Sequence, residues 1–222
     1  MKMKARAAGA LFLVSTAAFL IGSGMLDPIL HRTDLLAGMD ADRTNVFAGV
    51  FLELINAIAV VGIAMLLHPV LKKYNEAFAS GYFGSRILES ALLIMSLIGP
   101  LVLLALSDQA VSAGTSGDSY LQTVGHLAVD AHFMLFEMAM IVLGVGSLLF
   151  CYILYRSRLV PRWLSVVGFI GYAGLLASSC LSIVGLDSGT VLFIPGAIFE
   201  IVLPVWLIVK GFHLRTEERR RP

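Results

Sequence analysis

The sequence predicts an all-α membrane protein, built as a bundle of six transmembrane helices in a single domain over residues 1–222. Three observations support this prediction. Hydrophobic residues make up 58% of the chain and charged residues only 14%, against about 25% charged in soluble domains. The mean hydropathy is +0.88. Six segments are apolar over the length of a membrane span, and their short connections leave no room for a soluble domain. This composition excludes a nucleic-acid-binding protein and a disulfide scaffold.

The first expected span, residues 6–26, follows the basic start MKMKAR and resembles the beginning of a secretory signal. Its apolar run is long, however, and no Ala-x-Ala cleavage site follows it. We therefore expect a retained helix that anchors the chain in the membrane.

The remaining spans are each longer than the 20 or so residues that cross about 30 Å of hydrocarbon. Runs such as ALLIMSLIGPLVLLAL and AMIVLGVGSLLFCYIL are apolar on every side. This pattern favours helices, because a helix satisfies its own backbone polar groups within the bilayer. We expect these five spans at residues 46–68, 84–107, 130–155, 161–184 and 190–212.

The positions of Lys and Arg predict the orientation, because short loops rich in these residues stay on the cytoplasmic side. With the N-terminus inside, the outer side holds only Arg32 and Arg43 and is otherwise rich in Asp. Both termini are therefore expected in the cytoplasm. The inner basic residues are Lys2, Lys4, Arg6, Lys72, Lys73, Arg86, Arg156, Arg158, Arg162, Lys210, Arg215, Arg219, Arg220 and Arg221.

The five histidines do not predict a haem site. A haem held by two histidines needs one ligand on each of two facing helices at one depth. His68 and His213 lie at the inner ends of two spans. His126 and His132 lie at the outer end of a single span, and His31 lies in an outer loop. We expect no haem, and the sequence leaves any other cofactor open.

Charged residues inside the spans are informative, because each costs about 2.5–3.5 kcal/mol at the bilayer centre and such residues often mark function. Arg86 and Glu89 lie three residues apart near the inner end of the third span. This spacing puts them on one helix face, where they can neutralise each other. We expect a structural ion pair, with a cytoplasmic gate or a substrate contact as the alternative.

Three further glutamates predict a separate site. Glu53, Glu137 and Glu200 each lie seven to ten residues below the expected outer end of an inward-running span, which at about 1.5 Å per residue places all three about 10–15 Å below the outer surface. Glycines and alanines on the same helix faces allow close approach of neighbouring helices. We therefore expect these carboxyls to converge in one pocket sheltered from lipid.

Other polar residues accompany this expected carboxyl layer. Asn56 lies beside Glu53, and Tyr172, at mid-membrane on the fifth span, needs a partner for its hydroxyl that a glutamate can provide. His126 and Asp130 lie above Glu137 on one helix face, like a polar path from the outer surface. His132 lies off that path, directed at a neighbouring helix or at the headgroups.

Clustered carboxylates in a low-dielectric site cannot all be ionised, so protons or a cation must accompany them. The layer therefore suggests a ligand, proton or cation site, or else neutral glutamates that only hold the bundle together. No HExxH or Glu-x-x-His pattern is present, so we assign no metal site. Glu53, Glu137 and Glu200 would be the ligands if a metal were bound.

Several segments together resemble a family of uncharacterised bacterial six-helix integral membrane proteins, defined only as a domain of unknown function. The resemblance runs over nearly the whole chain. It implies a multi-pass protein of the bacterial cytoplasmic membrane, and it brings no reaction, substrate or site residue. The segments that carry it are ARAAGALFLV, the run from Glu53 to LLHPVLKK, RILESALLI, YRSRLVPRWLSVVGFIGY and FEIVLPVWLIVKGF.

Three functions remain open from the sequence. The favoured one is a membrane protein that binds a small molecule, proton or cation at the carboxyl layer, with transport as one such role. The second is an intramembrane enzyme that uses a glutamate as general acid or base on a lipid-like substrate. The third is a structural or partner-binding subunit. Membrane lipids are the expected partners in every case, no nucleic acid is expected, and the oligomeric state is left open.

Overall fold

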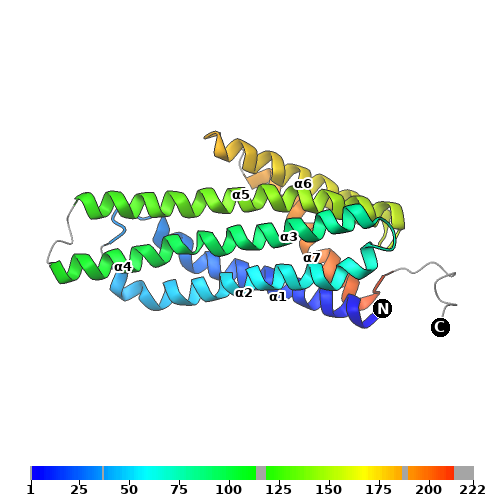
Figure 1. Ribbon diagram of the computed structural model, residues 1–222, viewed down its shortest axis with the longest axis horizontal. Helices are drawn as coiled ribbons and strands as arrows, with labels where there is room; N and C mark the ends of the chain where they lie inside the picture. Colours follow the sequence, from blue (N-terminus) through cyan, green and yellow to red (C-terminus); the bar gives the residue numbers. More distant parts are fainter. Residues whose placement is uncertain (1, 37, 114–118, 187–189, 213–222) are drawn as a thin grey trace.

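The computed structural model describes residues 2–36, 38–113, 119–186 and 190–212, and the regular secondary structure within these residues is all helical (Figure 1). Long helices run side by side along the long axis of the molecule. Their bounds are α1 (Lys2–Leu30), α2 (Met39–Leu71), α3 (Glu76–Ser96), α4 (Ile98–Ala113), α5 (Ser119–Ser157), α6 (Arg162–Ile183), the 3-10 helix η1 (Thr190–Phe193) and α7 (Ile194–Val209).

The predicted all-α membrane fold is confirmed, because the described residues form helices that are long and apolar enough to span a bilayer. Five segments meet this condition by length and apolar composition: α1, α2, the continuous pass formed by α3 and α4, α5, and α6. The sixth expected span corresponds to η1 and the 16-residue α7, which is apolar but shorter. The chain is therefore a multi-pass membrane protein.

The helices differ greatly in length, and this difference changes the expected span boundaries. α5 has 39 residues and α2 has 33, whereas α6 has only 22. At about 1.5 Å per residue, α6 is about 33 Å long, close to the hydrocarbon thickness, whereas α5 is about 58 Å long. The additional length lies at the end opposite the termini, where α4 and the start of α5 extend past α6 (Figure 1). The helices that contain the spans expected from residues 46 and 130 thus begin earlier, at Met39 and Ser119.

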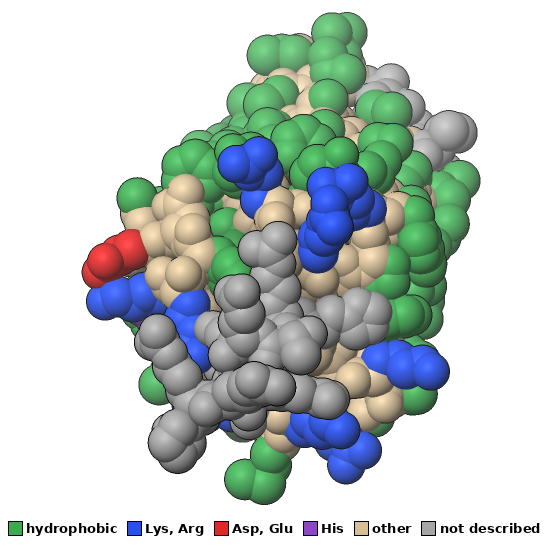
Figure 2. Space-filling model, turned by 90° about the vertical axis from the view of Figure 1, so that its right-hand side faces the viewer, with side chains coloured by type: hydrophobic (Ala, Val, Ile, Leu, Met, Phe, Trp, Pro, Cys, Tyr) green, Lys and Arg blue, Asp and Glu red, His purple; other side chains and the backbone are tan. Residues whose placement is uncertain are grey.

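The other end of the bundle, called here the inner end, collects both ends of the described chain and the connections α2–α3 and α5–α6 (Figure 1). Lys and Arg side chains surround it (Figure 2). This arrangement agrees with the expectation that most basic residues lie on one side of the membrane. The assignment of that side to the cytoplasm stays a prediction. His213 and the basic residues at 215 and 219–221 lie outside the described residues.

The inner half of the bundle is packed solid by the largest hydrophobic cluster, to which α1, α2, α3, α5, α6 and α7 all contribute. Glycines allow the closest helix contacts. A Cβ atom added at Gly9 on α1 would lie 2.7 Å from the Pro204 carbonyl oxygen on α7. Likewise, a Cβ atom at Gly171 on α6 would lie 2.4 Å from the Gly196 nitrogen on α7. These contacts hold α7 against both neighbours and so determine where its side chains lie.

We predict that Gly9→Ala destabilises the protein by about 1–3 kcal/mol, because the added methyl group cannot fit without separating α1 from α7. Gly84→Ala on α3 is the matched control, since nothing lies within 4 Å of its added Cβ. This control should be neutral or stabilising by up to about 1 kcal/mol, from helix propensity. Denaturant unfolding in mixed micelles measures both, and equal effects of the two substitutions would contradict the close contact.

Candidate functional site

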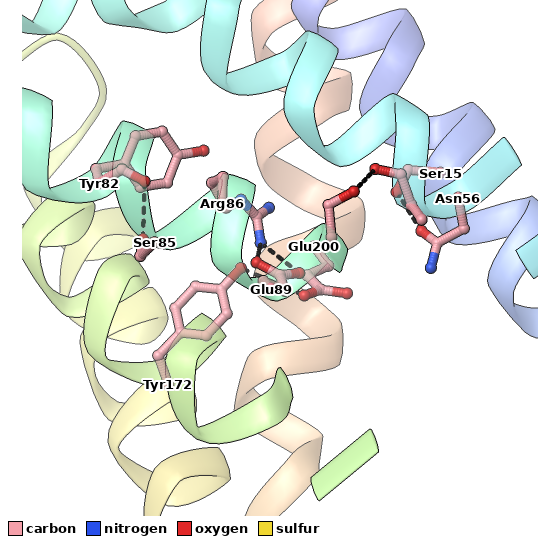
Figure 3. A network of polar contacts seen from close by, with 10 residues as sticks. Ser15, Asn56, Tyr82, Ser85, Arg86, Glu89, Tyr172 and Glu200 are labelled. Atoms are coloured by element: carbon pink, nitrogen blue, oxygen red, sulfur yellow. Dashed lines mark hydrogen bonds and ion pairs between the residues drawn. The ribbon is translucent and has the colours of Figure 1, made fainter. Parts of the chain in front are cut away.

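A cavity of about 310 Å³, called here the central cavity, lies between α1, α2, α3, α5, α6 and α7. Its walls are mainly apolar, and polar side chains gather at one part of it (Figure 3). The polar residues that line it are Ser15, Thr16, Asn56, Arg86, Glu89, Glu137, Tyr172, Ser179 and Glu200.

The expected ion pair of Arg86 and Glu89 is present and forms the charged part of the central cavity. Arg86 Nη1 donates to both carboxylate oxygens of Glu89, at 2.7 and 3.0 Å. The two residues are only 5% and 2% exposed, and the guanidinium also lies 5.7 Å from the ring centre of Tyr82. The Arg86 Nε has no hydrogen-bond partner among the described residues. Because isolated buried charges are very costly, each member of this pair stabilises the other.

Glu200 and Tyr172 face this ion pair from α7 and α6 (Figure 3). The Tyr172 hydroxyl donates to Glu200 Oε1 at 3.3 Å, so the hydrogen bond expected between Tyr172 and a glutamate forms with Glu200. This hydrogen bond depends on the close crossing of α6 and α7 at Gly171 and Gly196. Gly171 directly precedes Tyr172, and Gly196 lies one turn before Glu200. The local sequence thus positions an acid and a phenol at the cavity.

Asn56 on α2 links the central cavity to α1. The Ser15 hydroxyl donates to Asn56 Oδ1 at 2.6 Å, and both residues are buried. At the next residue of α2, the Ala57 carbonyl accepts a hydrogen bond from the Ser90 hydroxyl of α3 at 2.8 Å. These contacts connect three helices by polar groups that the bilayer could not satisfy.

A second cavity of about 250 Å³, called here the outer cavity, lies farther from the inner end. Glu53 and His132 line it, and each is 8% exposed. The His132 Nδ1 is 2.8 Å from the Ser96 carbonyl oxygen, so His132 is directed at a neighbouring helix and not at the headgroups. Asp27 and Ser23 of α1 complete its polar lining.

Glu137 lines both cavities. Its Oε1 accepts a hydrogen bond from the Ser182 hydroxyl at 3.0 Å. Phe19 and Phe136 also line both, and their rings stack with centroids 5.9 Å apart. The two cavities are therefore neighbours, separated by this ring pair.

The convergence of Glu53, Glu137 and Glu200 in one pocket stays a prediction: Glu53 and Glu137 line the outer cavity, and Glu137 and Glu200 line the central cavity. Counted from the inner helix ends at about 1.5 Å per residue, Glu53 and Glu137 lie about 27 and 30 Å away, but Glu200 only about 14 Å. Glu200 thus shares the depth of Arg86 and Glu89, about 15–20 Å from the start of α3, and lines the same cavity.

A metal bound jointly by Glu53, Glu137 and Glu200 does not fit this geometry. Within the described ranges, no group of three or more His, Cys, Asp and Glu residues is placed to hold a metal ion. The carboxyls are instead distributed over two cavities, each partnered by neutral donors or by Arg86.

The polar path expected along α5 is also not found. His126 and Asp130 are exposed and line neither cavity. They precede Glu137 on α5 by eleven and seven residues, respectively, and Glu137 already bonds Ser182 in the last turn of α6. Sequence reasoning missed Ser15, Ser179 and Asp27. Ser15 and Ser179 could have been proposed as site residues because each is a polar residue within an apolar span. Serines in such spans, however, often form hydrogen bonds only within their own helix.

We predict that Glu89→Gln destabilises the protein by about 3–5 kcal/mol, because it leaves the Arg86 charge buried without a counter-charge. Glu76→Gln provides the matched control: it breaks the exposed Lys72–Glu76 pair of 2.7 Å and should cost far less. The double variant R86M/E89L, which removes both charges, should recover most of the loss. Thermal unfolding in nanodiscs compares the three, and a double variant as unstable as Glu89→Gln would contradict this account.

Comparison with family models places residues 7–211 in a single match, described as a domain of unknown function (DUF4386). Comparisons with curated proteins and with solved structures gave no match. The family match extends from the first turns of α1 to just past the end of α7, so it includes both cavities and all their lining residues. The chain therefore belongs to the family defined by this domain of unknown function, DUF4386.

Proposed function

We propose that this protein binds an amphipathic, lipid-like molecule in the central cavity, with the polar group of the ligand at Arg86, Tyr172 and Glu200. The observation that carries the proposal is the combination of a buried polar end with apolar walls in one cavity. Such a combination is typical of binding sites, where a few polar groups orient a ligand that apolar walls hold.

The edge of the central cavity supports entry from the bilayer. Leu20 of α1, Phe193 of η1 and Ile201 of α7 line it and are 62%, 40% and 55% exposed, respectively. In a membrane, such exposed apolar side chains meet acyl chains. A ligand could thus leave its tail among these residues while its polar group reaches the interior.

Two observations favour binding over a continuous transport path. Toward the inner end, the bundle is filled by buried side chains such as Phe150, Phe199 and Leu203. Toward the outer end, His126 and Asp130 do not line a cavity. The presence of two cavities beside the glutamates also disfavours a purely structural subunit, for which we expected close packing around them.

Glu200 with its bonded Tyr172 also supports the enzyme alternative. A carboxyl and a phenol at hydrogen-bond distance beside a cavity are groups that can move a proton to or from a bound molecule. Binding without turnover and binding with turnover predict the same occupancy of the cavity. Chemical analysis of the recovered ligand distinguishes them.

The test is photolabelling in nanodiscs with a long-chain alcohol that carries a diazirine in its tail. We expect adducts on cavity residues such as Phe12 and Met140, and at least a tenfold loss of these adducts in Ala197→Trp, which fills the cavity. Ala173→Trp is the matched control, because Ala173 lies exposed on α6 and lines neither cavity. Adducts spread evenly over lipid-facing residues in all three proteins would contradict the proposal.

A further inference from the structure

The connection between α5 and α6 concentrates positive charge at the inner end, which Lys and Arg side chains surround (Figure 2). Arg156 lies in the last turn of α5, Arg158 directly follows that helix, and Arg162 is the first residue of α6. All three are exposed. The Arg162 guanidinium carbon lies 5.1 Å from the centre of the Tyr155 ring, so this side chain reaches back across the connection to the end of α5. The three arginines therefore form one surface, called here the arginine patch.

No carboxylate of the described residues neutralises the arginine patch. None of the ion pairs that these residues form includes Arg156, Arg158 or Arg162, and the first turn of α6 contains no acidic residue. The α2–α3 connection at the same end differs, because Lys72 there is paired with Glu76 at 2.7 Å. Neighbouring positive charges repel one another, so the arginine patch favours an anion that lies among them.

The level of the arginine patch in the membrane indicates which anion it meets. The 22 residues of α6 span about 33 Å, close to the hydrocarbon thickness, so Arg162 at its start lies where the hydrocarbon meets the headgroups. Tyr152, Tyr155 and Trp163 flank the patch and are 42%, 41% and 54% exposed, respectively. Exposed Tyr and Trp side chains are enriched at this boundary. The anions found there are the phosphates of phospholipids.

The backbone at Arg158 suits glycine, yet an arginine occupies the position. Its φ is 57°, a left-handed conformation that is strained for a residue with a Cβ atom and unstrained for glycine. The other described residues with a positive φ are Gly38, Gly185 and Gly211. The Arg158 side chain is exposed and cannot compensate for this strain by packing. Strain of this kind is typical of functional positions, which supports a role for the guanidinium group.

We propose that the arginine patch binds the phosphate of an anionic phospholipid such as phosphatidylglycerol. The inference concerns a surface outside both cavities and does not depend on the proposed function. The planar guanidinium groups of the patch donate paired hydrogen bonds to phosphate oxygens. The acyl chains of the same lipid lie along Trp163, Val166 and Ile170, which are exposed on one face of α6. Phosphatidylcholine is bound less tightly, because its head group carries no net charge.

Trp163 provides a local reporter for the test, because the chain has two tryptophans and Trp206→Phe removes the other. This parent variant is reconstituted at physiological salt into vesicles that mix phosphatidylglycerol with phosphatidylcholine, with bromine on the acyl chains of one lipid or the other. Bromine quenches the fluorescence of a tryptophan that it contacts, so the two sets of vesicles give the ratio of lipid binding constants at Trp163. We expect phosphatidylglycerol to be favoured at least about fivefold, or ~1 kcal/mol.

Arg158→Gly in this parent separates lipid binding from a structural role. It removes one charge of the arginine patch and relieves the backbone strain, so the lipid ratio should fall about threefold while the thermal unfolding midpoint stays the same or rises. Arg156→Gln should lower the ratio in the same way. Lys72→Gln is the matched control, because it removes an equal charge from the same end of the molecule, and it should leave the ratio nearly unchanged.

Three outcomes would overturn the proposal. A lipid ratio near one in the parent variant would show that the arginine patch does not select anionic lipid. Equal falls in Arg158→Gly and Lys72→Gln would show attraction by the overall charge of the inner end and not a site. Loss of the lipid ratio on addition of excess inorganic phosphate would instead assign the patch to a soluble phosphate.

Discussion

The ion pair between Arg86 and Glu89 is the interaction around which the middle of this bundle is organised. A lone charge at this depth would be prohibitive, so the two residues must remain together on α3. Their presence then requires other polar groups nearby and room for them. Tyr172, Glu200, Ser15 and Asn56 all face the same space from four other helices. The cavity is the consequence, because polar groups of different length do not fill space as well as the aliphatic side chains of the inner half.

Close helix contacts determine the geometry of this polar region. Gly171 and Gly196 bring α6 and α7 so near that a single Cβ at Gly171 would overlap the backbone of its neighbour. Tyr172 directly follows one of these glycines, and Glu200 lies one turn after the other. The distance between phenol and carboxyl is therefore determined by backbone contact and not by flexible side chains. A site built in this way has little freedom to rearrange, which favours selective binding.

The helical membrane architecture could be predicted from composition and the lengths of the apolar runs, because these follow directly from bilayer thickness. The Arg86–Glu89 pair was also predictable, since i and i+3 positions share a helix face. The grouping of Glu200 with that pair was not. The apolar pattern shows neither how the helices are shifted along one another nor which of them cross closely, and the contact of Tyr172 with Glu200 depends on both.

The unequal lengths of α5 and α6 have a further consequence for how the molecule responds to its solvent. If α6 matches the hydrocarbon, the start of α5, the end of α4 and the start of α2 stand in the aqueous phase. There the Arg43–Asp108 ion pair links α2 to α4, and the Gln122–Asp34 hydrogen bond links α5 to the connection between α1 and α2. Dissolved salt screens contacts of this kind, whereas the Arg86–Glu89 pair is shielded from ions. Rising ionic strength therefore loosens the protruding tip of the protein and leaves its interior unchanged.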